Sequence, residues 1–102
     1  MRTLLIDDFR KINADVVART YEEGLSFLQS EHWDRVYLDN DLGSSVGKDG
    51  YSLACFMEEH PEHRPGEVVI VSSNPVGRQN IERCLSNFCT RVGVGTWRVN
   101  PT

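Results

Sequence analysis

Short apolar runs alternate along the chain with segments in which apolar residues recur at helical spacing. The apolar runs predict strands at residues 3–6, 15–19, 35–38, 67–71 and 92–99. The helical spacing predicts one helix from residue 20, one over residues 51–60 and one from residue 75. Because strands that alternate with helices are typical of parallel sheets, we expect an α/β domain with a mainly parallel five-stranded sheet.

Two of the expected helices have recognisable starts. Thr20 and Glu23 match a capping box, in which the hydroxyl and the carboxylate each accept a hydrogen bond from a free backbone N–H group. Asn74 followed by Pro75 is also a favoured start, because asparagine caps helices well and proline suits the first helical position. These signals fix where the first and third helices begin.

Polar residues follow three of the predicted strands, at the point where each strand ends. The clusters are Asp7 and Asp8, then Asp39, Asn40 and Asp41, then Ser72, Ser73 and Asn74. In parallel sheets, ligands bind outside the carboxyl ends of the strands. Polar clusters at three such ends therefore predict a binding site at that edge.

The carboxylates of the first two clusters need a counter-charge if they lie together at neutral pH. Mg²⁺ supplies such a charge, prefers oxygen ligands and keeps water molecules that a phosphate can replace. We expect Asp7, Asp8 and Asp39 to hold Mg²⁺ or Mn²⁺ and, through it, a small phosphorylated ligand. The alternative is that these residues are helix caps or solvated acids at strand ends.

Further residues suit a phosphate group. Ser72, Ser73 and Asn74 precede a helix whose N-terminal dipole favours anions. Arg10 and Arg78 have the fork of N–H groups that clamps a phosphate. The alternatives are plain helix capping by Asn74 and arginines that are simply exposed on the surface.

Composition narrows the class of protein. The 102 residues fit one domain, residues 1–102, and 39% hydrophobic with 25% charged residues is typical of a folded protein. The net charge of -4 argues against binding to a nucleic-acid polymer, and no apolar run approaches the roughly 20 residues that span a membrane. Three cysteines without C-x-x-C spacing favour free thiols and a cytoplasmic location.

The order of short motifs in this chain resembles that of response-regulator receiver domains. The motifs are Leu5-Ile6-Asp7-Asp8, Tyr37-Leu38-Asp39, Asp49-Gly50-Tyr51 and Ile70-Val71-Ser72-Ser73. Over residues 4–85 the chain more closely resembles a divergent branch, the cyclic-phosphate-processing receiver domains. The motifs shared with that branch are Asp7-Asp8-x-Arg10, Leu38-Asp39-x-Asp41-Leu42-Gly43 and Ser72-x-Asn74-Pro75-x-Gly77-Arg78.

This resemblance implies a receiver-like, flavodoxin-like fold and a metal-dependent hydrolase that acts on a cyclic phosphate or a cyclic nucleotide. Carried over by motif, Asp7, Asp8 and Asp39 are the metal ligands. The implied catalytic residues are Asp39, Asp41 and Ser72, and the implied phosphate-binding residues are Arg10, Ser73, Asn74 and Arg78.

Three departures from the family pattern affect which function is expected. In the branch, a histidine often occupies the positions where this chain has Asn40 and Val71, and such histidines are suited to proton transfer. If those histidines transfer protons, the chain lacks these acid–base groups, and binding and sequestering the ligand without cleavage is the alternative to hydrolysis. Ordinary receivers also carry a lysine after the fifth strand, and no lysine follows Lys48. That absence disfavours the third function, a signalling receiver phosphorylated on Asp39.

A complete receiver has helices on both faces of its sheet, and this chain is expected to lack the first and the last of them. The segment after Asp8 is too short for a useful helix, and the chain stops soon after Val99. The remaining helices should share one face if their crossovers keep the usual right hand. We expect a second copy to cover the other face in a homodimer, or alternatively the segment around Trp97 to fold over it.

Overall fold

A six-stranded mixed sheet forms the centre of the computed structural model, with strand order β2-β1-β3-β4-β6-β5. The strands are β1 (Thr3–Ile6), β2 (Val16–Ala18), β3 (Arg35–Leu38), β4 (Glu67–Ile70), β5 (Cys89–Gly93) and β6 (Thr96–Val99). The helices are α1 (Tyr21–Ser30), α2 (Gly50–Glu59), the short 3-10 helix η1 (Pro61–His63) and α3 (Pro75–Leu85). The structure describes residues 1–101, so Thr102, the end of the expected domain 1–102, lies outside the described residues.

The sheet is parallel on one side and antiparallel on the other, which corrects the expectation of five mainly parallel strands. β1 pairs in parallel with β2 and β3, and β3 with β4, whereas β6 pairs antiparallel with both β4 and β5. The predicted single strand over residues 92–99 is a hairpin instead. Gly95 adopts a φ of 63°, a left-handed conformation that glycine reaches easily and that lets the chain reverse.

The hydrophobic core lies on one face of the sheet, between the strands and the helices. Val36, Val68 and Trp97 are neighbours across β3, β4 and β6, and all three side chains are buried in this core. Trp97 therefore faces the helices. The alternative in which the segment around Trp97 folds over the opposite face is wrong, because the period-2 alternation of β6 puts Trp97 on the same side as Val68.

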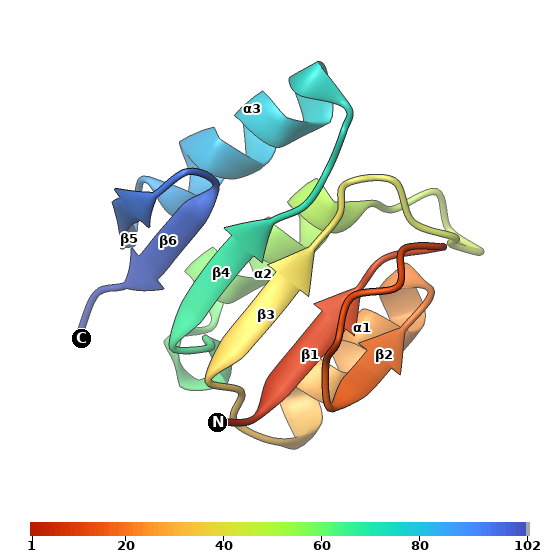
Figure 1. Cartoon of the computed structure of the whole chain (residues 1–102), viewed down its shortest axis with the longest axis horizontal. Helices are drawn as coiled ribbons and strands as arrows, with labels where there is room; N and C mark the ends of the chain where they lie inside the picture. Colours follow the sequence, from red (N-terminus) through yellow and green to blue (C-terminus); the bar gives the residue numbers. More distant parts are fainter. Residues whose placement is uncertain (102) are drawn as a thin grey trace.

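All three α-helices cover the same face, as expected for right-handed crossovers (Figure 1). Residues 7–15 join β1 to β2 without a helix, and no helix follows β6 among the described residues. Figure 1 shows this connection passing over β1 and β2 on the side away from the helices. Leu5 is fully buried although it does not belong to the helix-side core, which agrees with cover from that connection.

The helix starts follow their local signals with one difference. The Thr20 hydroxyl accepts a hydrogen bond from the Glu23 N–H at 3.1 Å, as the capping box predicts. The Glu23 carboxylate, however, accepts from the N–H of Arg19 at 2.7 Å, one residue before the cap. Asn74 caps α3 as predicted. No helix among residues 1–101 is long and apolar enough to cross a lipid bilayer.

The N-terminus of α2 approaches the end of β3 closely. The N–H of Gly50 donates to the carbonyl of Asn40 at 2.9 Å, and a Cβ atom at Gly50 would collide with the carbonyl oxygen of Asp39. A backbone atom cannot rotate out of the way as a side chain can. Gly50 therefore sets the distance between this helix and the polar edge of the sheet.

We expect Gly50→Ala to lower the free energy of unfolding by about 1–3 kcal/mol, the usual range for overpacking. Gly43→Ala is the matched control, because a Cβ there meets its nearest neighbour, a Thr20 methyl, at an ordinary 3.5 Å. Urea unfolding followed by circular dichroism measures both changes. Equal stability of the two variants would contradict the close approach of α2 to β3.

Candidate functional site

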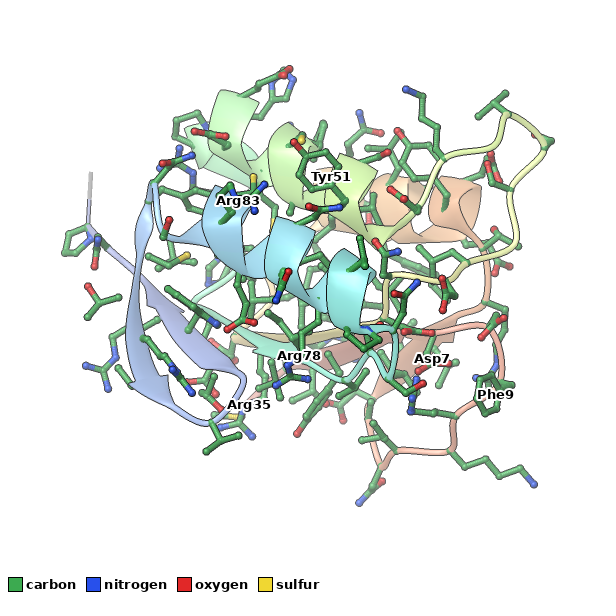
Figure 2. All side chains as sticks on the ribbon, turned by 90° about the horizontal axis from the view of Figure 1, so that it is seen from above. Asp7, Phe9, Arg35, Tyr51, Arg78 and Arg83 are labelled. Carbon is green, nitrogen blue, oxygen red and sulfur yellow. The ribbon has the colours of Figure 1, made fainter. Side chains whose placement is uncertain are left out.

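Two carboxylates from adjacent parallel strands lie side by side at the upper edge of the sheet. Ile6 pairs with Leu38, so the next residues, Asp7 and Asp39, leave β1 and β3 together. Asp8 follows directly, and one carboxylate oxygen from each of the three aspartates lies within 4.8 Å of the others. Figure 2, which views the molecule from above, shows where Asp7 lies at this edge.

Asp7 is fully buried and held in its ionised form. Burial alone would raise the pKa of its carboxyl, but the backbone N–H groups of Arg10 and Phe9 and the Arg10 guanidinium outweigh burial and lower it. Both N–H groups donate to Oδ1 at 3.0 Å, while Nη1 of Arg10 contacts Oδ2 at 2.9 Å. Asp7 therefore presents a permanent negative charge inside the protein.

The pKa of Asp39 is shifted in the opposite direction to that of Asp7. Its burial, together with the negative charge of Asp7, raises the pKa of the Asp39 carboxyl. The Arg10 guanidinium, with Nη1 at 3.4 Å from Oδ2, and the Ser72 hydroxyl partly offset that rise. Two neighbouring carboxylates with opposite pKa shifts form a site that gains from an added cation.

Arg19 fixes the backbone of the segment that carries Arg10. Arg19 directly follows β2, and its Nη1 donates to the carbonyl oxygens of Asp7 at 3.2 Å and of Arg10 at 2.8 Å. The sequence indicates no role for Arg19 beyond the end of the strand expected at residues 15–19. No local pattern indicates its role, because both acceptors are backbone atoms of a non-adjacent loop.

The N-terminus of α3 forms the second side of the site. The Asn74 Oδ1 accepts from the N–H groups of Val76 and Gly77, both at 3.1 Å, and its backbone N–H donates to the Ser72 hydroxyl oxygen at 3.1 Å. Its Nδ2 donates to Asp41 at 3.4 Å. Asp41 and Asn74 are thus joined at the solvent-exposed rim of the site, whereas Ser72 is buried beside Asp39.

Asn40 lies between the two third-strand aspartates and has a structural role that the sequence did not reveal. It is buried, its Oδ1 accepts from the N–H of Tyr51 at 3.2 Å, and its side chain packs against Gly77 of α3. Asn40 therefore ties the first turns of α2 and α3 to the end of β3. The resemblance leads one to expect a histidine at this position, and the asparagine found there contacts both helices instead.

One of the expected phosphate-binding residues, Arg78, lies away from the carboxylates. Nη1 of Arg78 donates to the carbonyl oxygens of Ile70 and Ser72, both at 3.4 Å, and its Nε lies 3.9 Å from Glu82. Figure 2 shows Arg78 below α3 and well separated from Asp7. Ser73 is exposed to solvent. Among the arginines expected to bind phosphate, Arg10 is the one that contacts the aspartates.

A polar pocket of about 270 Å³ opens beside the aspartates. Its lining comes mostly from the loop between β3 and α2 and consists of Asp8, Asn40, Asp41, Leu42, Ser44, Gly47, Lys48 and Asp49. Sequence reasoning placed no ligand-binding residue at Ser44 or Lys48. The spacing of a glycine-rich loop gives no sign of which of its side chains turn toward the site.

The aspartates fit a hard divalent cation. All donor atoms are carboxylate oxygens, which Mg²⁺ and Mn²⁺ prefer, and they converge from two strands that the sheet holds rigidly. Asp7, Asp8 and Asp39 are the residues that would hold the ion. Its charge would offset the burial and the repulsion from Asp7 that together raise the pKa of Asp39.

The comparison with protein families agrees with this geometry. A family model described as "Cyclic-phosphate processing Receiver domain" matches residues 2–87. That span contains β1 to α3 and all the site residues discussed above, while the hairpin of β5 and β6 lies beyond it. No curated protein and no solved structure matches the chain.

We expect Mg²⁺ at roughly 100 times its Kd to stabilise the fold by about 2.7 kcal/mol, because an ion that binds only the folded state shifts the equilibrium toward it. Asp39→Asn should remove most of this metal-dependent gain. Differential scanning calorimetry with and without metal measures it.

Asp34→Asn is the control for that experiment, since Asp34 lies at the opposite end of β3 and accepts a hydrogen bond from the Arg2 N–H. Its metal-dependent gain should equal that of the unsubstituted chain. A Tm that millimolar Mg²⁺ and Mn²⁺ both leave unchanged would argue against a metal site at these aspartates.

Proposed function

The chain belongs to the cyclic-phosphate processing receiver domains, and from that membership we propose that it hydrolyses a cyclic phosphate, such as a cyclic nucleotide, with the help of a divalent metal. The observation that supports the proposal is the pair of buried carboxylates, Asp7 and Asp39, which meet with Asp8 at the end of the parallel strands. Such a pair stabilises the protein poorly on its own and suits a metal-held phosphate well.

In the proposed reaction a water molecule adds to phosphorus and one of the two ester P–O bonds of the ring breaks. The water gives up one proton, and the departing alkoxide gains one, so the product is an open monoester with a free hydroxyl. Mg²⁺ or Mn²⁺ would supply positive charge next to the phosphate oxygens. Asp41, which is exposed at the rim, is the proposed proton acceptor.

The remaining residues hold the phosphate and the carboxylates in place. The buried Ser72 hydroxyl, which helps to lower the pKa of the Asp39 carboxyl, is proposed to orient that carboxylate. We assign phosphate contacts to Arg10 at the carboxylates and to Ser73 and Asn74 on the side of α3. Arg78 joins them only if its guanidinium leaves the carbonyl oxygens that it now contacts.

A second candidate function is binding without cleavage. It is favoured by Asn40, whose amide oxygen accepts from the first turn of α2 and which cannot act as a general acid or base at neutral pH. In this case the same carboxylates and arginine would sequester the ligand rather than process it. Turnover distinguishes the two functions, because both predict binding.

We expect the protein with Mg²⁺ or Mn²⁺ to convert 2′,3′- or 3′,5′-cyclic nucleotides into monoesters, as followed by ³¹P NMR. Asp41→Asn should slow turnover by about 10²-fold, the lower range for general-base catalysis, and leave binding largely intact. Asp34→Asn should turn over at the rate of the unsubstituted chain. Binding without turnover in any cyclic nucleotide would select the sequestering function.

The same samples test the signalling alternative, a receiver phosphorylated on Asp39. Acetyl phosphate is a phosphodonor that ordinary receivers accept, and the lysine that they use has no counterpart after Lys48. Mass spectrometry should find little aspartyl phosphate. A stoichiometric adduct on Asp39 would place signalling ahead of hydrolysis.

The state of the thiols supports the expected location. Cys55, Cys84 and Cys89 are all free, and burial raises the pKa of Cys84 and lifts that of Cys89 to about 12. Free cysteines without a disulfide partner are typical of proteins in a reducing compartment. We therefore propose a reducing cytoplasm as the compartment.

We also propose that a second copy of the chain covers the open face of the sheet. The connection over β1 and β2 leaves β3 and β4 without a covering element there, where Tyr37 and Val69 are half-buried neighbours. Arg35 pairs with Glu67 beside them and lies over the Tyr37 ring at 5.9 Å. A face that carries an acid, a base and an aromatic ring is complementary to itself under two-fold symmetry.

Light scattering at micromolar concentration should therefore give twice the monomer mass of 11.6 kDa. Tyr37→Asp, which puts a charge into the contact, should give monomers, whereas Val76→Asp should not, because Val76 is exposed on α3, on the helix side of the sheet. A clean monomer for the unsubstituted chain would rule out this dimer. A dimer that survives Tyr37→Asp would move the contact elsewhere.

A further inference from the structure

We propose that the Arg10 guanidinium occupies the place of the divalent metal in the metal-free protein, and that the metal displaces it toward the phosphate of the ligand. Arg10 would then be both the stand-in cation and the residue that links metal binding to ligand binding. The inference rests on the proposed metal site and deepens it, by naming the group with which the metal must compete.

The distances place Arg10 on two of the carboxylates that a metal would use. Nη1 of Arg10 lies 2.9 Å from Oδ2 of Asp7 and 3.4 Å from Oδ2 of Asp39. These two carboxylates belong to the group whose oxygens converge within 4.8 Å. A single guanidinium nitrogen thus bridges the two buried charges.

Asp7 has no second oxygen to offer. Its Oδ1 already accepts the backbone N–H groups of Phe9 and Arg10, both at 3.0 Å. Only Oδ2 remains free to bind a cation, and this is the atom that the Arg10 guanidinium contacts. A metal on Asp7 therefore has to replace that contact, since two cations on one oxygen would repel each other.

The side chain of Arg10 can leave while its backbone stays. The N–H of Arg10 is held by Asp7, and its carbonyl oxygen by Arg19 at 2.8 Å. The Arg10 side chain is 24% exposed, and its guanidinium carbon lies 5.3 Å from the centre of the Phe9 ring, which is itself exposed to solvent. Because its backbone stays in place, the displaced guanidinium would remain within reach of a metal-held phosphate, which offers two oxygens in the geometry that arginine prefers.

This arrangement predicts opposite effects of one substitution on two ligands. Arg10→Gln removes the competing cation, so Mn²⁺ should bind about 10-fold more tightly or better, the fold-change that corresponds to one charged hydrogen bond. The same variant loses the phosphate contact, so inorganic phosphate should bind the Mg²⁺-saturated protein about 10-fold more weakly. A residue with a purely structural role would not strengthen one and weaken the other.

Lys11→Gln is the matched control, because it removes the same charge from the next residue, whose side chain is exposed. Electron paramagnetic resonance of free Mn²⁺ gives the metal affinity of the full chain and of both variants. Isothermal titration with inorganic phosphate gives the anion affinity. Lys11→Gln should change either affinity by less than about 2-fold, as a screened surface charge does.

Equal Mn²⁺ affinity in the unsubstituted chain and in Arg10→Gln would show that the metal does not displace the Arg10 guanidinium, although the metal site itself would still be supported. Tighter metal binding with unchanged phosphate affinity would overturn the second half of the proposal. No Mn²⁺ binding by any variant would defeat the proposed function itself. If Arg10→Gln unfolds, ¹⁵N NMR of the unsubstituted chain decides, because Mg²⁺ should shift the Arg10 guanidinium signal and an unmoved signal would overturn the exchange.

Discussion

The burial of two like charges on neighbouring parallel strands is the constraint on which the site depends. Asp7 and Asp39 leave β1 and β3 at the same level because the strands are in register, and both are withdrawn from water. Carboxylates in that position require compensating positive charge or protons. Backbone N–H groups donate to Asp7, and the Arg10 guanidinium contacts both carboxylates. Arg19 in turn donates to the backbone carbonyl of Arg10 and so holds that residue in place.

The parts of this site that the sequence predicts are those that depend on local pattern. β1 and β3 have the bounds that were expected, because strands buried in a parallel sheet are continuous apolar runs. The convergence of Asp7 and Asp39 follows from parallel pairing alone. The family match over residues 2–87 spans the short motifs that carry the resemblance.

The parts that the sequence does not predict depend on contacts between distant segments. The expected strand over residues 92–99 is a hairpin because Gly95 turns the chain, and an isolated glycine within an apolar run indicates equally a bulge, a bend or a turn. Arg19 contacts two carbonyl oxygens, which leave no trace in a sequence. Asn40 was read as a missing histidine, whereas in the fold it spaces α2 from α3.

The hairpin also determines the order in which the sheet can be completed during synthesis. β6 follows β5 in the chain but lies between β4 and β5, so β5 reaches the sheet only through β6. On the ribosome β5 therefore emerges before its partner strand exists, and Trp97 joins the core among the last of its members. A nascent chain at that stage exposes the flank of β4 and an unpaired strand, which is the kind of surface that chaperones recognise.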